Sequence, residues 1–454
     1  MNTPIADFID EYAKKQTIRA HMPGHKGKGD IEALDITEIP GADVLYSSRG
    51  IIRESEENAA RLFGSRRTVY STEGSSLSIR GMLFLIRLYA ESLGKPCRLL
   101  ACRNAHRVFI TACALLDIGV DWIYPTDCSF LTCRLTPERL DSLLSERADN
   151  PPAAVFITSP DYLGSIADIA GLSEVCRCHG VLLAVDNAHG AYLAFLEPSR
   201  HPIALGADIC CDSAHKTLHA LTGCGYLHIG DGAAAGLFAD NAERAMALFA
   251  TTSPSYLLLR SLDLLNSSLT GSYRRELSDC VSDVSKAKAR LSEGGFVLYG
   301  GDPLRITIDA PASGRDGNAL AASLDGIVCE MADRDNLVMM FTPSNNAGDI
   351  DRAADALLKI GAREPLRRQM PALHLPVLAA GMSPREALLA PSETIPAAEG
   401  EGRVLSDPAV SCPPAVPIAV CGEIVTAGAV KLFEYFGIDK INVVRRGYEI
   451  IEKT

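Results

Sequence analysis

Two side chains that could act on one cofactor each follow a short apolar run of this sequence. The run 181–185 ends at Asp186, and the run 207–211 leads through Asp212 to Lys216. A lysine can form a Schiff base with an aldehyde, and a carboxylate can keep a pyridine nitrogen protonated. Pyridoxal phosphate requires both groups, because the protonated ring then accepts electrons from the substrate. We therefore predict that Lys216 and Asp186 bind pyridoxal phosphate.

Each of these residues also has a purely structural interpretation. A lysine is by default a surface residue, and an aspartate after a strand commonly caps the next turn. A surface lysine seldom follows an apolar strand directly, whereas a Schiff-base lysine lies in a cleft that depresses its pKa. The pairing of Lys216 with Asp186 favours the cofactor interpretation. For His189, two alternatives remain: a hydrogen bond in the core, or a role in orienting Asp186 or the cofactor ring.

A group of small residues has the pattern of a phosphate site. Gly74, Ser75 and Ser76 follow an apolar pair and precede a helical stretch. Free backbone N–H groups at a helix start, beside hydroxyl side chains, bind phosphate, although Gly-Ser-Ser is also an ordinary helix cap. Beside Lys216 this segment becomes the predicted seat of the cofactor phosphate, with Ser213 as a further ligand.

One histidine is placed to contact the cofactor ring. His106 lies just after the apolar run 98–102. A lone histidine is usually structural, but at the end of another strand it can stack on an aromatic ring. We predict that His106 stacks on the cofactor.

The pattern of the chain between about residues 60 and 230 predicts the scaffold for these side chains. Helix-like stretches alternate with apolar runs at 98–102, 153–157, 181–185 and 207–211. Such alternation indicates an α/β fold, with a mostly parallel sheet covered on both faces. Ligands of these sheets bind beyond the carboxyl ends of the strands, where the candidate residues would emerge.

The second half of the chain has a different pattern. A long polar helix is predicted over 257–291, followed by strands of a smaller α+β domain. Prolines are frequent over 371–417, which predicts an extended connection into a short carboxyl-terminal unit. The predicted divisions are an N-terminal segment 1–50, a large cofactor-binding domain 51–255, a small α+β domain 256–365 and a carboxyl-terminal domain 366–454.

Composition narrows the class of protein. The 454 residues are 47% hydrophobic and 22% charged, as in an ordinary globular protein, and the net charge of −12 argues against a nucleic-acid partner. The amino terminus lacks a secretory signal pattern, and the apolar runs are shorter than the roughly 20 residues of a membrane span. We expect a cytoplasmic protein.

The 14 cysteines are scattered and often lie inside apolar runs, which is typical of reduced, buried thiols. Cys176, Cys178 and His179 resemble half of a metal site. No second pair lies at zinc-finger spacing, so we expect no metal.

The segments above, with several others, resemble the pyridoxal-phosphate-dependent ornithine/lysine/arginine decarboxylase family. The resemblance covers nearly the whole chain. It implies the aspartate aminotransferase-type fold (fold type I), with a mostly parallel seven-stranded sheet and helices on both faces. The segments that carry it are 21–27 (HMPGHKG), 54–56 (ESE) with 62–64 (LFG), 74–76 (GSS), Arg103-Asn104 with His106, 158–160 (TSP), Asp186 with 188–190 (AHG), 213–217 (SAHKT) and 252–256 (TSPSY).

The family resemblance also implies a reaction and an assembly. The reaction is decarboxylation of an amino acid, most simply a basic one (arginine, lysine or ornithine), to the amine and carbon dioxide, as in polyamine biosynthesis. His215, at the cofactor beside Lys216, or Lys216 itself, would supply the proton to the α-carbon. The assembly is a homodimer or larger, with active sites at the interface. Thr252 and Ser253 look like the segment that reaches the neighbouring subunit's cofactor phosphate.

Other reactions remain open on the residues alone. The same cofactor site serves aminotransferases and lyases, and an aminotransferase usually binds the substrate carboxylate with an arginine such as Arg305. Glu73 stands where the family commonly has asparagine, Val108 where serine is common, and His219 replaces a proline or small residue. We therefore expect the cofactor site to be standard and the substrate pocket to differ.

Overall fold

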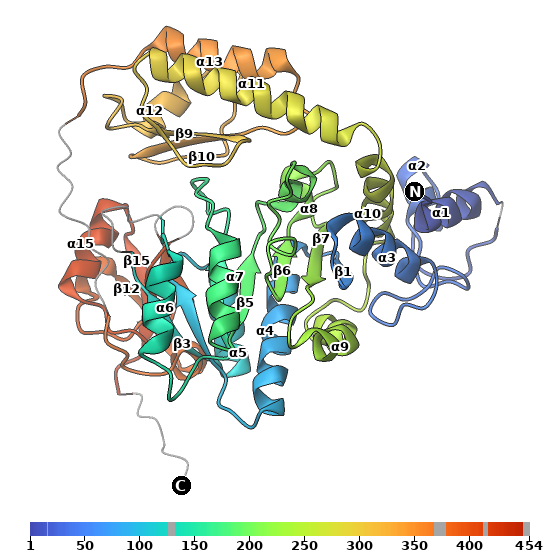
Figure 1. Ribbon diagram of the computed structural model, residues 1–454, viewed down its shortest axis with the longest axis horizontal. Helices are drawn as coiled ribbons and strands as arrows, with labels where there is room; N and C mark the ends of the chain where they lie inside the picture. Colours follow the sequence, from blue (N-terminus) through green and yellow to red (C-terminus); the bar gives the residue numbers. More distant parts are fainter. Residues whose placement is uncertain (16, 126–131, 367–377, 412–415, 448–454) are drawn as a thin grey trace.

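The computed structural model describes residues 1–15, 17–125, 132–366, 378–411 and 416–447. A seven-stranded sheet forms its centre, in the order β1-β7-β6-β5-β4-β2-β3 (Figure 1). β7 runs antiparallel to both of its neighbours, and the other neighbouring pairs are parallel, which confirms the predicted α/β fold with a mostly parallel sheet. The strands are β1 (Arg67–Ser71), β2 (Arg98–Cys102), β3 (Gly119–Ile123), β4 (Ala154–Thr158), β5 (Leu182–Asp186), β6 (Ile209–Asp212) and β7 (Gly225–Ile229).

Successive residues of the central strands point to opposite faces of the sheet. In β4, Ala154 and Phe156 belong to the core beneath α4, α5 and α9, whereas Val155 and Ile157 belong to the core beneath α6 and α7. Both faces are therefore buried, and the strands consist of continuous apolar runs. The covering helices are α4 (Gly74–Ser92), α5 (Arg107–Leu116), α6 (Pro137–Ser145), α7 (Ile169–Cys178) and α9 (Ala235–Ala247).

The segments that follow the parallel strands meet at one edge of the sheet. β1 leads into α4, β2 into α5, and β6 into the short helix α8 (Ala214–Thr217). β4 and β5 end in loops at the same edge, because both are parallel to β2 and β6. This edge is where open α/β sheets bind their ligands.

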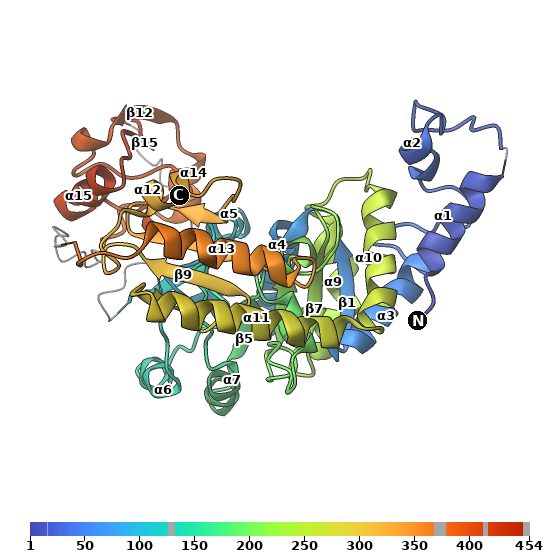
Figure 2. The same ribbon diagram turned by 90° about the horizontal axis from the view of Figure 1, so that it is seen from above.

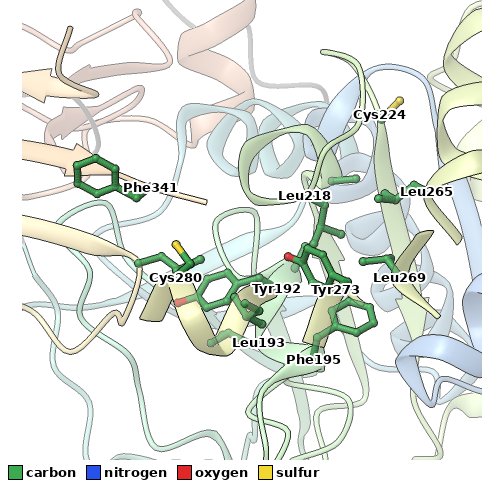
Figure 3. Close-up of a cluster of buried hydrophobic side chains, with 14 of the residues drawn as sticks. Tyr192, Leu193, Phe195, Leu218, Cys224, Leu265, Leu269, Tyr273, Cys280 and Phe341 are labelled. Atoms are coloured by element: carbon green, nitrogen blue, oxygen red, sulfur yellow. The ribbon is translucent and has the colours of Figure 1, made fainter. Parts of the chain in front are cut away.

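A buried aromatic cluster holds the segment that follows β5. The 3-10 helix η1 (Ala191–Phe195) begins directly after the loop 187–190, and its side chains are buried (Figure 3). Phe195 meets Tyr273 of α11 (Tyr273–Glu293) edge to face, with ring centroids 5.4 Å apart. The hydroxyl of Tyr192 donates to Asp302 over 2.8 Å. The site loop is thereby packed against the second domain.

The second domain is built on an antiparallel sheet in the order β10-β11-β9-β8, with α11 and α13 packed together on it (Figures 1 and 2). The single helix predicted over 257–291 is wrong. Two helices, α10 (Tyr256–Leu269) and α11, are separated at Gly271, and the Thr270 hydroxyl bonds the Ser267 carbonyl at the break. The other elements are β8 (Leu298–Tyr299), β9 (Arg305–Asp309), α12 (Gly317–Ala322), β10 (Met331–Ala332), β11 (Asn336–Met340) and α13 (Ala347–Ile360).

The proline-rich stretch was also predicted wrongly as an extended connection. Its described part, which omits 371–377 and 412–415, is folded. Pro384 starts α14 behind the capping box of Ser383 and Glu386, and Pro396 ends strand β12, so these prolines occupy element boundaries. The described residues 378–411 and 416–447 form a carboxyl-terminal unit. Its elements are α14 (Pro384–Leu389), β12 (Ser392–Pro396), η2 (Ala397–Glu399), β13 (Ala409–Ser411), β14 (Pro417–Val420), α15 (Ala427–Tyr435) and β15 (Lys440–Val444).

The N-terminal segment lies at the other end of the molecule from this unit (Figures 1 and 2). It contains α1 (Pro4–Lys14) and α2 (Asp30–Leu34) and leads into α3 (Ile51–Phe63). Asp263 of α10 accepts the backbone N–H groups of Ile5 and Ala6, both over 2.9 Å, and so caps α1. Among the described helices, none combines the length and the apolar character that crossing a membrane requires.

Candidate active site

A cavity of about 380 Å³ lies at the carboxyl edge of the central sheet. It brings together every residue predicted to bind the cofactor except Thr252 and Ser253. The residues that line it are Glu73, Gly74, Ser75, Ser76, Asn104, His106, Thr158, Asp161, Tyr162, Asp186, Ala188, His189, Ser213, His215, Lys216, Thr222 and Gly223.

Lys216 lies inside this cavity on α8. Its Nζ is 3.0 Å from Nε2 of His189. Burial lowers the pKa of Lys216, while the negative charges of Asp186 and Glu330 oppose that shift. A larger fraction of the amine is therefore neutral than in an exposed lysine, which is the form that attacks an aldehyde.

Asp186 is buried at the end of β5, where it is 3% exposed. One carboxylate oxygen accepts the backbone N–H of Ala188 over 3.2 Å and the thiol of Cys211 over 3.6 Å. The carboxylate lines the cavity together with Lys216, where it could keep a ring nitrogen protonated.

His189 is buried between the lysine and Tyr162, whose ring it meets edge to face at 5.4 Å. Burial lowers the pKa of His189 well below its ordinary value, and the positive charges of Arg305 and Lys216 add to the effect. The imidazole is therefore neutral at physiological pH. His189 thus lines the cavity and contacts Lys216, while its predicted role in orienting Asp186 or the cofactor ring remains a prediction.

The predicted phosphate seat is a narrow turn at the start of α4. Gly74 adopts φ +62°, and a Cβ there would lie 3.3 Å from the ring of His215. The Ser213 hydroxyl donates to the Ser75 hydroxyl over 2.9 Å and accepts the Ser75 backbone N–H at 3.4 Å. Hydroxyl groups and the first N–H groups of a helix thus meet at one end of the cavity, next to Ser76.

An acidic residue, Glu73, lies at this predicted phosphate site. Glu73 lines the cavity, and one of its oxygens accepts the backbone N–H of Thr251 over 2.9 Å. Thr252 and Ser253 follow in an exposed loop outside the cavity of their own chain. Their predicted contact with a neighbouring subunit's phosphate remains a prediction.

Two further histidines have defined orientations. Nδ1 of His106 accepts the backbone N–H of Val108 over 3.3 Å. Nδ1 of His215 lies 2.8 Å from the carbonyl of Cys224, to which it donates. The opposite nitrogen, Nε2, is then the one through which the His215 ring can take up and release a proton.

Asp161 and Tyr162 are cavity residues that the sequence analysis did not single out. They follow the Thr-Ser-Pro segment at the end of β4, which was the available signal. Arg305, considered as a clamp for a substrate carboxylate, is instead buried and donates to the backbone carbonyls of both residues. In this structure Arg305 shapes the cavity wall and does not line the cavity.

Of the three departures noted from the family pattern, one reaches the cavity. Glu73 lines it, while Val108 is buried in the core beneath α5 and His219 bonds the hydroxyl of Ser268 over 2.7 Å.

A buried polar cluster lies behind the loop that carries Asp186. Asn187 donates to one oxygen of Asp212 over 2.7 Å, and His201 and His228 contact the other at 3.1 and 3.3 Å. Although burial opposes it, the two histidines hold the pKa of Asp212 well below its usual range. The cluster anchors the site loop to β6 and β7.

His201 and Asp212 also form, with Cys210, the one group of potential metal ligands in the described part of the chain. Nδ1 of His201 accepts the backbone N–H of Ile203 at 3.4 Å, so the ring proton lies on Nε2, toward Asp212. This arrangement is that of a hydrogen bond and not of a metal ligand.

The cavity residues fit pyridoxal phosphate. Within the described part of the chain, three buried polar atoms at the cavity have no hydrogen-bond partner: Oδ1 of Asn104, Oγ1 of Thr158 and Nδ1 of His189. Buried polar groups are rarely left unpaired, which indicates a polar ligand. The lysine, the carboxylate and the phosphate seat are the groups that this cofactor requires.

Comparison with known proteins identifies the family. The model of the "Orn/Lys/Arg decarboxylase, major domain" family matches residues 3–303. The chain belongs to this family of pyridoxal-phosphate-dependent decarboxylases. The arginine decarboxylase of Bacillus subtilis is 27% identical over 458 residues, covering 93% of this chain and 91% of the relative. That of Halalkalibacterium halodurans is 26% identical, with the same coverage.

Solved structures show the same fold. The constitutive lysine decarboxylase of Escherichia coli has a TM-score of 0.77 at 18% identity, covering 98% of this chain and 82% of that one. A NifS-like protein has a TM-score of 0.55 at 14% identity, and the match covers 79% of this chain and 96% of that protein. The fold type I assignment is therefore confirmed, and the comparisons favour a decarboxylase over an aminotransferase or another lyase.

Proposed function

We propose that this chain decarboxylates a basic amino acid, with arginine as the first candidate, to the corresponding amine and carbon dioxide. The observation that carries the proposal is the convergence of Lys216, Asp186 and the Gly74 turn on one cavity, in a chain similar to arginine decarboxylases over nearly its whole length. Bound pyridoxal phosphate supplies the electron sink for this reaction.

Each of the main cavity residues has a separate role in this proposal. Lys216 attaches the cofactor, Asp186 keeps the ring nitrogen protonated, and His106 supports the ring. His189 orients the lysine, to which it is hydrogen-bonded. Gly74, Ser75, Ser76 and Ser213 bind the phosphate.

Proton return to the α-carbon is assigned to His215. Because its Nδ1 donates to the Cys224 carbonyl, Nε2 is the nitrogen through which the ring would deliver this proton. Lys216 is the alternative donor.

Glu330, an acidic residue that is hydrogen-bonded to Tyr162, supports the choice of a basic substrate. The Tyr162 hydroxyl, on the cavity wall, donates to Oε1 of Glu330 over 3.0 Å, and the charge of Glu330 acts on Lys216. A carboxylate here would attract the cationic end of the substrate side chain.

We also propose a cytoplasmic homodimer or larger assembly that acts in polyamine biosynthesis. The exposure of the loop at Thr252 and Ser253, which Glu73 joins to the cavity rim, supports this proposal. The described cysteines are free and mostly buried, as expected in a reducing compartment. Light scattering tests the assembly: a monomer at working concentration would exclude it.

The reaction is tested with purified protein and pyridoxal phosphate. Carbon dioxide release should occur with at least one of arginine, lysine and ornithine and be far slower with non-basic amino acids. If none is decarboxylated while a keto acid accepts an amino group, an aminotransferase is the correct assignment.

A further inference from the structure

A buried ion pair joins the carboxyl-terminal unit to the active-site wall. Arg103 directly follows β2 and is completely buried. Its Nη1 and Nη2 donate to the two carboxylate oxygens of Glu423, over 2.8 and 2.7 Å. The guanidinium also donates to the carbonyls of Pro417 and Ile418, at 3.2 and 3.3 Å. All of these polar partners belong to the carboxyl-terminal unit.

Glu423 is itself held in place. It is 6% exposed, and its Oε2 accepts the backbone N–H of Val420 over 2.8 Å. On the other side, the guanidinium of Arg103 lies over the ring of Trp122, 4.9 Å from its centroid. A bidentate pair with this many fixed partners has one geometry, so the position of Arg103 depends on the carboxyl-terminal unit.

The segment that Arg103 begins forms part of the cavity. Asn104 is the next residue, and His106 is the N-cap of α5; both line the cavity. The carboxyl-terminal unit also holds the far end of α5, because Arg385 of α14 donates to the carbonyl of Leu115 over 2.8 Å. The wall segment and its helix are thus held at both ends by the same unit.

We propose that Glu423 is a positioning residue, which sets Asn104 and His106 against the cofactor ring through Arg103. The carboxyl-terminal unit is then part of the machinery that binds the cofactor, although none of its described residues lines the cavity. The proposal rests on the cofactor site described above. It does not depend on which substrate the enzyme uses.

Two variants of Glu423 test the role. Glu423→Gln removes the charge, and Glu423→Asp keeps the charge but withdraws it by one methylene, so one variant remains if the other does not fold. The matched control is Glu393→Gln, which breaks the 2.5 Å pair with Arg403 inside the same unit, away from the cavity.

The first readout uses the apoprotein. Hydrogen exchange followed by mass spectrometry should accelerate in both Glu423 variants over residues 103–116 and stay unchanged around Gly74 and Lys216. Emission from Trp122, the single tryptophan of the chain, should change as the guanidinium moves. Glu393→Gln should show neither effect. Exchange that is unchanged over 103–116, or that rises evenly over the chain, overturns the proposal.

The second readout is cofactor binding. Both Glu423 variants should bind pyridoxal phosphate about tenfold more weakly and with a shifted visible absorption band, because a loosened wall no longer holds the ring. Affinity and spectrum equal to those of Glu393→Gln would leave Glu423 a stabilising residue and refute the positioning role. A wild-type protein that binds the cofactor but releases no carbon dioxide would refute the proposed reaction and leave this inference intact.

Discussion

Nζ of Lys216 lies 3.0 Å from Nε2 of His189, at the point where the loops after β5 and β6 meet. After burial and the charge of Arg305, the positive charge of Lys216 lowers the pKa of His189 further. Burial lowers the pKa of both, so the imidazole is neutral and the amine is more easily deprotonated than in an exposed lysine. A nucleophilic amine beside an uncharged acceptor is suited to attack an aldehyde.

Lys216→Ala should abolish the visible absorption that pyridoxal phosphate gives with the wild-type protein, because the covalent link to the chain is lost. Activity should fall by at least about 10³-fold, as for the loss of a nucleophile. The measurement is an absorption spectrum after removal of free cofactor. Lys288→Ala is the control: Lys288 is also half-buried, but it donates to the Asp302 carbonyl and lies outside the cavity. Equal loss in both variants would contradict the assignment.

Glu330→Gln should move the pH dependence of cofactor attachment to lower pH. The negative charge of Glu330 raises the pKa of Lys216, opposing the lowering by burial. Without the charge of Glu330, the Lys216 amine loses its proton at a lower pH. The rate at which the cofactor attaches to the apoprotein therefore reaches half its maximum at a lower pH. Stopped-flow absorbance from pH 6 to 9 measures this midpoint. An upward shift, or none, would show that Glu330 does not act on the lysine.

Local sequence patterns were sufficient to find the residues that follow strands. Lys216, Asp186 and Gly74 were predicted because each comes at or shortly after the end of an apolar run, and parallel strands place such positions at one edge. Tyr162 lies in the same kind of position, but Arg305, from a distant part of the chain, holds its carbonyl in place. That contact leaves no trace in the sequence around residue 162.

The wrong predictions outside the site also arose because a local sequence pattern does not show tertiary contacts or helix breaks. The break at Gly271 interrupts a polar pattern that is helical on both sides, so the pattern alone does not show it. Pro384 was taken as evidence of an extended chain, although proline is well suited to the first turn of a helix. The pair Arg103 and Glu423 joins residues 320 positions apart. Contacts at such separations follow from tertiary packing, which no local window contains.

Glu56→Gln should flatten the decline in stability between about pH 4.5 and pH 8. Glu56 is buried, and burial raises its pKa to about 8. A carboxyl group whose pKa is raised on folding binds its proton more tightly in the native state. The native protein therefore loses stability as the pH rises from the unfolded value, near 4.5, to about 8. Glutamine resembles the protonated acid and removes this loss, which is worth at least about 1.4 kcal/mol.

Urea unfolding at pH 6 and pH 9 measures the effect. The adjacent Glu57→Gln provides the control, because Glu57 is exposed in an i,i+4 pair with Arg53. The free energy of unfolding should fall less from pH 6 to pH 9 in Glu56→Gln than in the wild type. An equal fall in the two proteins would mean that the pKa of Glu56 is not raised in the native state.

Glu73→Gln should tighten binding of the cofactor phosphate. Glu73 lines the phosphate end of the cavity, so its charge opposes the dianion that the helix start attracts. Glutamine keeps a carbonyl oxygen for the N–H of Thr251, and the loop that leads to Thr252 should stay in place. Removing one like charge at a partly solvated site is worth about 1 kcal/mol, or roughly fivefold in affinity.

The dissociation constant of pyridoxal phosphate from the apoprotein, measured at low and at high salt, separates the two roles of Glu73. Charge repulsion predicts a gain in affinity that shrinks as salt screens the site. Pyridoxal, which lacks the phosphate, serves as the control ligand, and its affinity should not change. A loss of affinity for both ligands would mean that Glu73 acts mainly by holding the Thr251 loop, and the repulsion argument would fail.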